Sequence, residues 1–126
     1  MYFEIDDYSA LKAALRNMCI KFSLENVPEE TLFDSKLVAT ELLSNVLQHG
    51  GGTAYFRAEL HDGKIMLSVR STNDFRPPEQ SSCSEATAER GRGLFLVDTI
   101  CEDRDYNERD GICVHIKIHQ VKKIEQ

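Results

Sequence analysis

The sequence has no tryptophan, only three prolines among its 126 residues, and no apolar run long enough to span a bilayer. It also lacks a basic excess. The net charge is −6, which argues against general nucleic-acid binding because phosphate contacts need a basic surface. The first seven residues are acidic and unlike a signal peptide. These absences predict a cytoplasmic protein with neither a membrane span nor a direct nucleic-acid partner.

The four cysteines contain no C-x-x-C pair and stand far apart, at Cys19, Cys83, Cys101 and Cys113. This pattern is typical of free thiols in a reducing compartment rather than of a disulfide framework. Cys113, His115 and His119 share one face of a predicted strand. Strand residues four apart are separated by about 13 Å, too far for two ligands of one metal ion. We therefore interpret this face as solvated rather than metal-binding.

Hydrophobic residues make up 41% of the chain, and residues 1–126 are enough for one domain with its own core. Periodicity and turn residues predict that the chain begins with a strand at 1–6, a helix capped by Ser9 and a second helix from Pro28 to the glycines at 50–52. A hairpin turning at 62–63, a helix after residue 93 and a second hairpin turning at 110–111 follow. This order predicts an α+β fold, a two-layer sandwich of a mostly antiparallel mixed sheet with helices packed on one face.

The most informative stretch is the end of the second predicted helix, residues 41–50, which reads ELLSNVLQHG. Its leucines and valine have helical spacing and should face a sheet, whereas Glu41 and Asn45 lie four apart on a different face. A carboxylate and an amide at this spacing can hold a divalent cation and its waters, and magnesium prefers such oxygen ligands. Taken alone, the stretch is equally typical of an exposed polar face on an amphipathic helix.

A second motif, Arg90-Gly91-Arg92-Gly93-Leu94, runs directly into an apolar helix. Glycines let the backbone approach a phosphate, and the following helix offers unpaired N–H groups at its N-terminus. The motif matches neither Rossmann nor Walker spacing, so alone it is more typical of a helix start with small residues. The irregular stretch before it, from residue 72 to 90, contains two adjacent prolines and predicts a functional or disordered loop.

Together, the two motifs resemble those of the Bergerat-fold, or GHKL, ATPase superfamily, which includes histidine kinases, gyrase and MutL-type proteins. More narrowly, the chain is similar to the small bacterial anti-sigma factor serine/threonine kinases. In that branch the N-box reads E-L-x-x-N-A-x-x-H-G, and residues 41–50 match it everywhere except at Val46. The second glycine box, R-x-G-x-G followed by a hydrophobic residue, is similar to residues 90–94. The resemblance covers nearly the whole chain.

The resemblance implies a Bergerat ATP-binding fold that uses ATP and Mg²⁺, with Glu41 as the general base and Asn45 as the magnesium ligand. It implies a lid over the nucleotide at residues 72–90. The implied activity is phosphorylation of a serine on a small antagonist protein, and the implied second partner is a sigma factor. The resemblance also leaves open that the chain forms a homodimer. The implied nucleotide contacts are Asn45, His49, Gly50, Ser71, Asn73, Arg90, Gly91, Arg92, Gly93 and Leu94.

One element departs from the family pattern. The first glycine box of the family reads D-x-G-x-G, and its Asp holds the adenine amino group. In this chain Ser71 takes the place of that Asp, and Asn73 and Phe75 take the places of the glycines. A charge-assisted hydrogen bond contributes about 1.5–3 kcal/mol against about 1 kcal/mol for a neutral one, which predicts roughly tenfold weaker ATP binding unless Asn73 or Asp74 substitutes.

This departure leaves an alternative function open. The chain then acts as a catalytically silent binding module or switch protein, through partner contact alone. The intact Glu41 and Asn45 favour the kinase instead. A detached histidine-kinase catalytic domain is a third and weaker interpretation, because the sequence has no dimerisation helix carrying a phosphoacceptor histidine.

Overall fold

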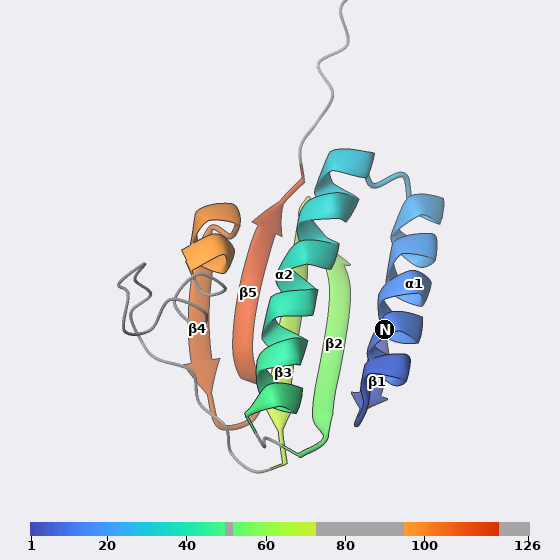
Figure 1. Ribbon diagram of the computed structural model, residues 1–126. Helices are drawn as coiled ribbons and strands as arrows, with labels where there is room; N and C mark the ends of the chain where they lie inside the picture. The colour runs from blue at the N-terminus through green and yellow to red at the C-terminus, as the bar shows by residue number, and fades with distance from the viewer. Residues whose placement is uncertain (50–51, 73–94, 119–126) are drawn as a thin grey trace, which may run out of the picture.

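A computed structural model describes residues 1–49, 52–72 and 95–118. These residues form two layers, a five-stranded sheet and a layer of helices on one of its faces (Figure 1). Residues 95–100 are helical and belong to the second layer. The labelled elements are β1 (Tyr2–Ile5), α1 (Tyr8–Leu24), α2 (Glu29–Gln48), β2 (Ala54–His61), β3 (Lys64–Ser71), β4 (Asp103–Asn107) and β5 (Gly111–Lys117). The predicted α+β sandwich is confirmed.

The sheet has the strand order β1-β2-β3-β5-β4, and all four neighbouring pairs are antiparallel. Both predicted hairpin turns are present. At the first, Asp62 and Gly63 have φ angles of 51° and 73°, the left-handed backbone that a two-residue type I′ turn requires. At the second, Gly111 has a φ of 74° and begins β5. The first hairpin fixes the register of β3, so that Ser71 lies opposite Ala54.

The core lies between the sheet and the two long helices. Alternate residues of β2 and β3, among them Phe56 and Leu67, are fully buried because they face the helices. The apolar face of α1 is buried as well, through Leu11, Ala14, Leu15, Met18 and Phe22. On α2 the motif residues Leu42, Leu43 and Val46 are buried against the sheet, which confirms their predicted orientation.

Two local predictions, both at helix starts, are wrong. The cap of α1 is Asp7, whose carboxylate accepts a hydrogen bond from the backbone N–H of Ala10 at 2.7 Å, whereas Ser9 lies inside the helix. Asp7 has the extended backbone that an N-cap needs, and a carboxylate also interacts favourably with the positive end of the helix. Pro28 similarly stands one position earlier than predicted, as the N-cap of α2.

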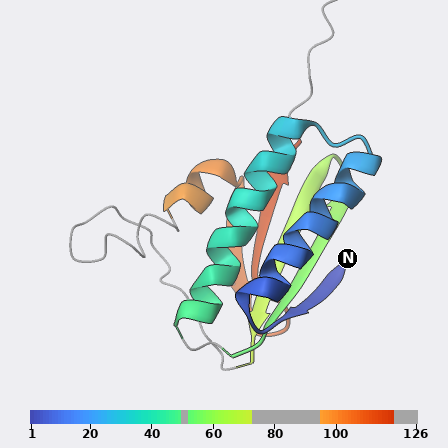
Figure 2. The ribbon, with the colours of Figure 1, turned by 45° about the vertical axis from the view of Figure 1, so that its right-hand side comes forward.

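The opposite face of the sheet carries no labelled helix, as Figure 2 shows from a second direction. Within the described residues, no helix combines the length and apolar character needed to cross a membrane. The three described cysteines, Cys19, Cys101 and Cys113, are free, and Cys83 lies outside the described residues. Across 1–49, 52–72 and 95–118, no group of three acidic, histidine or cysteine side chains is arranged to hold a metal, while His119 lies outside these ranges.

Candidate functional site

Glu41 and Asn45 lie on the last turns of α2, beside the stripe that packs on the sheet. Both side chains are half-buried, whereas Leu42 and Val46 next to them are buried. One helical turn separates the two polar residues, so the carboxylate and the amide point from the same side of the helix. Both residues are therefore less exposed than a fully solvated polar face would be, and their roles stay predictions.

The two flanks of α2 have different neighbours. On one flank is α1, where burial raises the pKa of the Cys19 thiol and the nearby charge of Lys36 lowers it. On the other flank is the chain around Cys101. The pKa of the Cys101 thiol is raised to about 12, chiefly by burial and additionally by the carboxylates of Asp98, Asp103 and Asp34 of α2. Figures 1 and 2 agree in placing α1 and residues 95–100 on opposite sides of α2.

Glu41 and Asn45 belong to the second of these flanks. Asp34 and Glu41 are seven residues apart, which is close to two helical turns, so they project in nearly the same direction. Asn45 continues this row one turn further on. The candidate site of α2 therefore faces the side occupied by residues 95–101 rather than the side occupied by α1.

The predicted helix after the second motif is confirmed over residues 95–100, and the motif residues Arg90, Gly91, Arg92, Gly93 and Leu94 themselves lie outside the described residues. Leu94 is bonded directly to Phe95, where the described helix begins. Val97 is fully buried and anchors this helix in the core. In sequence, the glycine motif is therefore followed directly by the helix at residues 95–100, which lies on the same side of α2 as Glu41.

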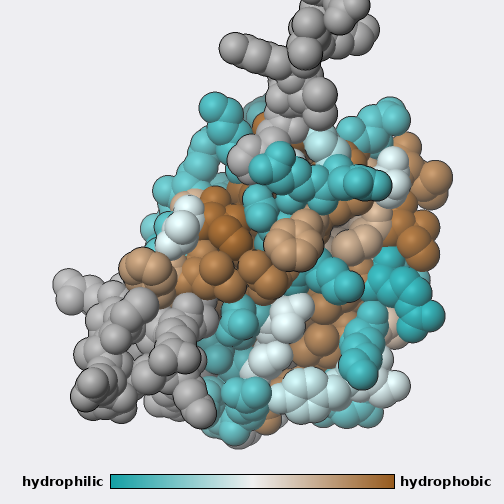
Figure 3. Space-filling model, turned by 45° about the horizontal axis from the view of Figure 1, so that its top comes forward, coloured by the Kyte–Doolittle hydropathy of each residue, from teal (hydrophilic) through white to brown (hydrophobic). Residues whose placement is uncertain are grey.

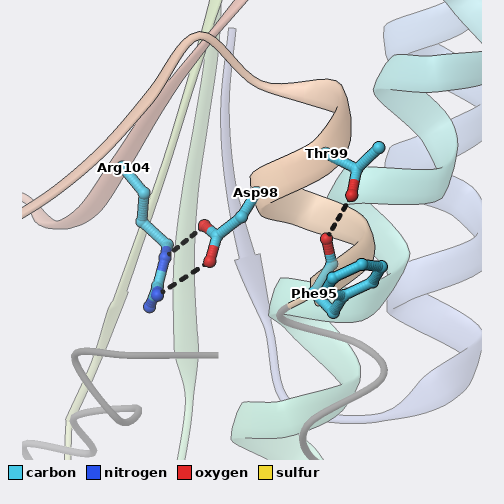
Figure 4. A network of polar contacts seen from close by, with 4 residues as sticks. All are labelled: Phe95, Asp98, Thr99 and Arg104. Carbon is cyan, nitrogen blue, oxygen red and sulfur yellow. Dashed lines mark hydrogen bonds and ion pairs between the residues drawn. The ribbon is translucent and has the colours of Figure 1, made fainter. Parts of the chain in front are cut away.

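Asp98 and Arg104 attach the same helix to β4, as Figure 4 shows. The Arg104 Nε donates to Asp98 Oδ1 at 2.7 Å, and a terminal guanidinium nitrogen donates to Oδ2 at 3.1 Å. Arg104 lies opposite the buried Val114, so it points to the helical side of the sheet. Sequence reasoning missed this pair, although the alternation of β4 places Arg104 on the inward side together with Tyr106.

Ser71, at the predicted adenine position, ends β3 and is only 8% exposed; it lies opposite the buried Ala54 and in register with Val69, so it points to the helical side of the sheet. The end of β3 is tied to the start of β2: the Thr72 N–H donates to the Thr53 carbonyl at 3.1 Å, and the Thr53 N–H donates to the Thr72 hydroxyl at 3.0 Å. The C-terminal end of α2 lies at this same end of the molecule (Figure 1). Ser71 of the sheet and the C-terminal turns of α2 therefore lie at the same end of the two-layer structure.

The remaining predicted nucleotide contacts lie at the ends of the described ranges or outside them. His49 is the C-cap of α2, and its backbone N–H donates to the Asn45 carbonyl at 3.1 Å. Gly50 and Asn73 lie outside the described residues, as does the predicted lid at 72–90 apart from Thr72. The roles of all these residues toward a nucleotide stay predictions.

The oxygen donors on α2 fit a magnesium ion. The Glu41 carboxylate and the Asn45 amide offer hard oxygen atoms, and neither residue is fully buried. Because magnesium usually keeps several waters and also binds substrate phosphates, one or two protein ligands suffice.

The outer surface of the helical layer also exposes apolar side chains. Figure 3 shows hydrophobic residues reaching this surface between polar ones. Ile20 and Leu24 of α1 and Phe33 of α2 are among the large exposed residues, with Leu24 reaching 79% exposure. Exposed apolar side chains of this size are available for contact with a partner.

Comparison with known proteins finds a family for this chain. No curated protein matches the chain as a relative. The family model of the histidine kinase-like ATPase domain matches residues 6–118, a range that includes α2, Ser71 and the glycine motif. Membership of this family implies ATP binding. Because the match spans most of its length, the chain belongs to the histidine kinase-like ATPase family.

Proposed function

We propose that the protein is an ATP- and magnesium-dependent protein serine kinase of the anti-sigma factor type. The single observation that carries the proposal is the placement of Glu41 and Asn45. They form a half-buried row on the flank of α2 that faces the helix following the glycine motif. A carboxylate base and an amide ligand on one flank are what phosphoryl transfer to a hydroxyl needs.

Asn45 is the proposed magnesium ligand, through its amide oxygen. When bound, the magnesium ion neutralises phosphate charge and orients the transferred group. The backbone of Gly91 to Leu94 is the proposed phosphate cradle, and Arg90 adds positive charge beside it. Ser71, buried at the end of β3, is the proposed contact of the adenine amino group.

Glu41 is the proposed general base. It accepts the proton of the substrate serine hydroxyl while the serine oxygen forms a bond to the γ-phosphorus. The bond between that phosphorus and the bridging oxygen of ATP breaks, and ADP leaves with the electron pair. A carboxylate is adequate for this role, because phosphoryl transfer depends mainly on positioning and charge neutralisation.

The proposed substrate is a serine on a small antagonist protein, and the proposed second partner is a sigma factor. Phosphorylation would release the antagonist, because a phosphate adds negative charge at a contact with a chain of net charge −6. The exposed Ile20, Leu24 and Phe33 support partner binding, since they offer apolar contact area on the helical layer.

The proposal is tested by following the γ-phosphate of labelled ATP with magnesium, both to water and to a candidate antagonist protein. Glu41→Gln should keep ATP binding and lose turnover by at least about a hundredfold, as expected for removal of a general base. Glu59→Gln, an exposed glutamate on β2, is the matched control and should retain activity. Equal turnover in Glu41→Gln and the wild type would exclude Glu41 as the base.

A silent binding module is the second candidate function, and the neutral Ser71 favours it. This buried serine stands where the family pattern has an aspartate, so the adenine contact lacks its charge. In this case ATP and magnesium bind weakly or have no effect on partner binding. Absence of any phosphate release or transfer by the wild type, with partner binding intact, would select this function over the kinase.

A further inference from the structure

A pocket of about 390 Å³ lies on the sheet face opposite the two long helices, because its strand residues alternate with those that face the helices. Its polar wall contains three arginines from three parts of the chain: Arg57 of β2, Arg70 of β3 and Arg109 of the turn between β4 and β5. Tyr2, Tyr55, Ser68 and Asp110 complete the lining. The pocket therefore gathers three positive charges and one negative charge on a chain whose net charge is −6.

The register of the sheet brings Arg57 and Arg70 together. Tyr55 lies opposite Arg70, and Arg57 lies opposite Ser68, so the two arginines are diagonal neighbours on one face. Diagonal positions on adjacent antiparallel strands are about 7–8 Å apart, close enough for two guanidinium groups to bind one pair of carboxylates. Both arginines are exposed, and within the described ranges neither forms an ion pair with a carboxylate.

Aromatic contacts pre-organise this arrangement. The Arg70 guanidinium carbon lies 4.5 Å above the centre of the Tyr55 ring, which holds the arginine by a cation–π contact. The Tyr2 ring stacks on Tyr55, with centroids 6.3 Å apart and an interplanar angle of 13°. Because Arg70 is held by a ring rather than by a carboxylate, its hydrogen-bond donors stay available to an incoming anion.

The third arginine is brought to the pocket by the turn between β4 and β5. The Asp110 N–H donates to the Asn107 side-chain oxygen at 2.6 Å, which closes this turn. Gly111 lies so close to β3 that an added Cβ would stand 2.1 Å from the Val69 carbonyl oxygen and 2.7 Å from the Arg70 Cα. The contact between Arg109 and Asp110 is long, at 3.9 Å, and the Arg109 side chain is 88% exposed. Arg109 is thus little restrained by its neighbour.

We infer that this pocket is a docking site for an acidic segment of a partner protein, whose carboxylates are held by Arg57 and Arg70. Guanidinium groups match carboxylates with two parallel hydrogen bonds, and the tyrosines provide apolar contact beside them. Nucleic acid is the less favoured occupant, because the acidic remainder of the chain repels a continuous phosphate backbone. The site lies on the face of the sheet away from Glu41 and does not depend on the proposed kinase activity.

The first test measures fluorescence anisotropy of a labelled oligoglutamate peptide with the full chain at low and high salt. Binding should weaken with salt, and an oligoglutamine peptide should not bind. Arg57→Gln and Arg70→Gln should each weaken binding by about tenfold, as expected for loss of one charge-assisted contact. Arg16→Gln, an exposed arginine on α1, removes the same charge elsewhere and should have little effect.

A second measurement locates the peptide and checks the fold. Amide signals of Tyr55, Ser68 and Arg70 should shift in nuclear magnetic resonance spectra on peptide addition, and those of Glu41 and Asn45 should not. Equal melting temperatures of the variants and the wild type establish that folding is unchanged. The inference is overturned if the wild type does not bind oligoglutamate, if Arg16→Gln weakens binding as much as Arg57→Gln, or if oligothymidylate binds more tightly than oligoglutamate.

Discussion

Arg104 of β4 and Asp98 of the helix at residues 95–100 form an ion pair with two parallel hydrogen bonds, at 2.7 and 3.1 Å. The side chains are 12% and 32% exposed, so water screens the pair only in part. The pair attaches the helix that follows the glycine motif to the edge strand of the sheet. It therefore restrains the helix that directly follows the proposed phosphate-binding motif in the sequence.

Replacing Arg104 by lysine should loosen this attachment, because an ammonium group cannot form both parallel hydrogen bonds. We expect Arg104→Lys to lower the free energy of unfolding by about 1–2 kcal/mol and to weaken ATP binding. Arg109→Lys, at an exposed arginine with a 3.9 Å contact, is the control and should change stability little. Urea unfolding measures the effect on stability, and ATP titration measures the effect on binding. Unchanged ATP affinity in Arg104→Lys would show that the Asp98–Arg104 ion pair does not affect the nucleotide site.

Ser71→Asp tests the adenine contact. The substitution restores the charged acceptor of the family pattern, and we expect tighter binding of ATP but not GTP, by on the order of 1 kcal/mol. Desolvation of a carboxylate at a position that is 8% exposed opposes this gain. Ser68→Asp, on the opposite face of the same strand, is the matched control and should leave ATP affinity unchanged. If Ser71→Asp and Ser71→Ala both leave ATP affinity unchanged, Ser71 does not contact adenine.

Gly111→Ala should destabilise the fold. The new Cβ would stand 2.1 Å from the Val69 carbonyl oxygen, and the φ of 74° is unfavourable for alanine. We expect a loss of at least about 2 kcal/mol in the free energy of unfolding. Gly63→Ala separates the two causes, because Gly63 has a φ of 73° but no atom within 4 Å of an added Cβ. Equal losses for the two variants would show that the close approach to β3 contributes nothing.

The buried Cys101 thiol predicts a loss of stability at alkaline pH. Its pKa rises from 9.0 to about 12 on folding, chiefly because of burial. Below pH 9 the thiol is protonated in both states and has no effect. Above pH 9 it ionises only in the unfolded chain, so this contribution to stability is lost as pH rises toward 12.

At about pH 10 the loss should be on the order of 1 kcal/mol relative to about pH 8. Urea unfolding at the two pH values measures it, with Cys101→Ala for comparison. The variant should be less stable at both pH values, because the substitution leaves a small cavity. Its stability should nevertheless fall less between them than that of the wild type. If stability fell equally with pH in the two proteins, ionisation of Cys101 would not be the cause of the alkaline loss.

Hydrophobic alternation and turn residues were sufficient to predict the fold. The strict period of two in β2 and β3 and the Asp62-Gly63 turn allow only one register, and this register buries Ser71. The cap of α1 was predicted less well, because Asp7 and Ser9 are both good capping residues and only the backbone conformation selects between them.

The site was predictable only where it depends on local spacing. Helical spacing places Glu41 and Asn45 on one flank of α2, but it does not say which element that flank faces. That relationship depends on tertiary packing, here through Asp34 and Cys101. The Asp98–Arg104 pair was missed for a similar reason, because the two residues belong to different elements, the helix at residues 95–100 and β4. The cluster of Arg57, Arg70 and Arg109 likewise requires the register of three strands.

Calorimetric titration of ATP into the wild type and Asn45→Ala, each with and without magnesium, tests the central claim most directly. Asn45→Asp, which keeps an oxygen ligand, serves as the conservative comparison. We expect magnesium to tighten ATP binding to the wild type, to have little effect on Asn45→Ala, and to act again on Asn45→Asp. Magnesium dependence that is equal in the wild type and Asn45→Ala would contradict the proposed site on α2.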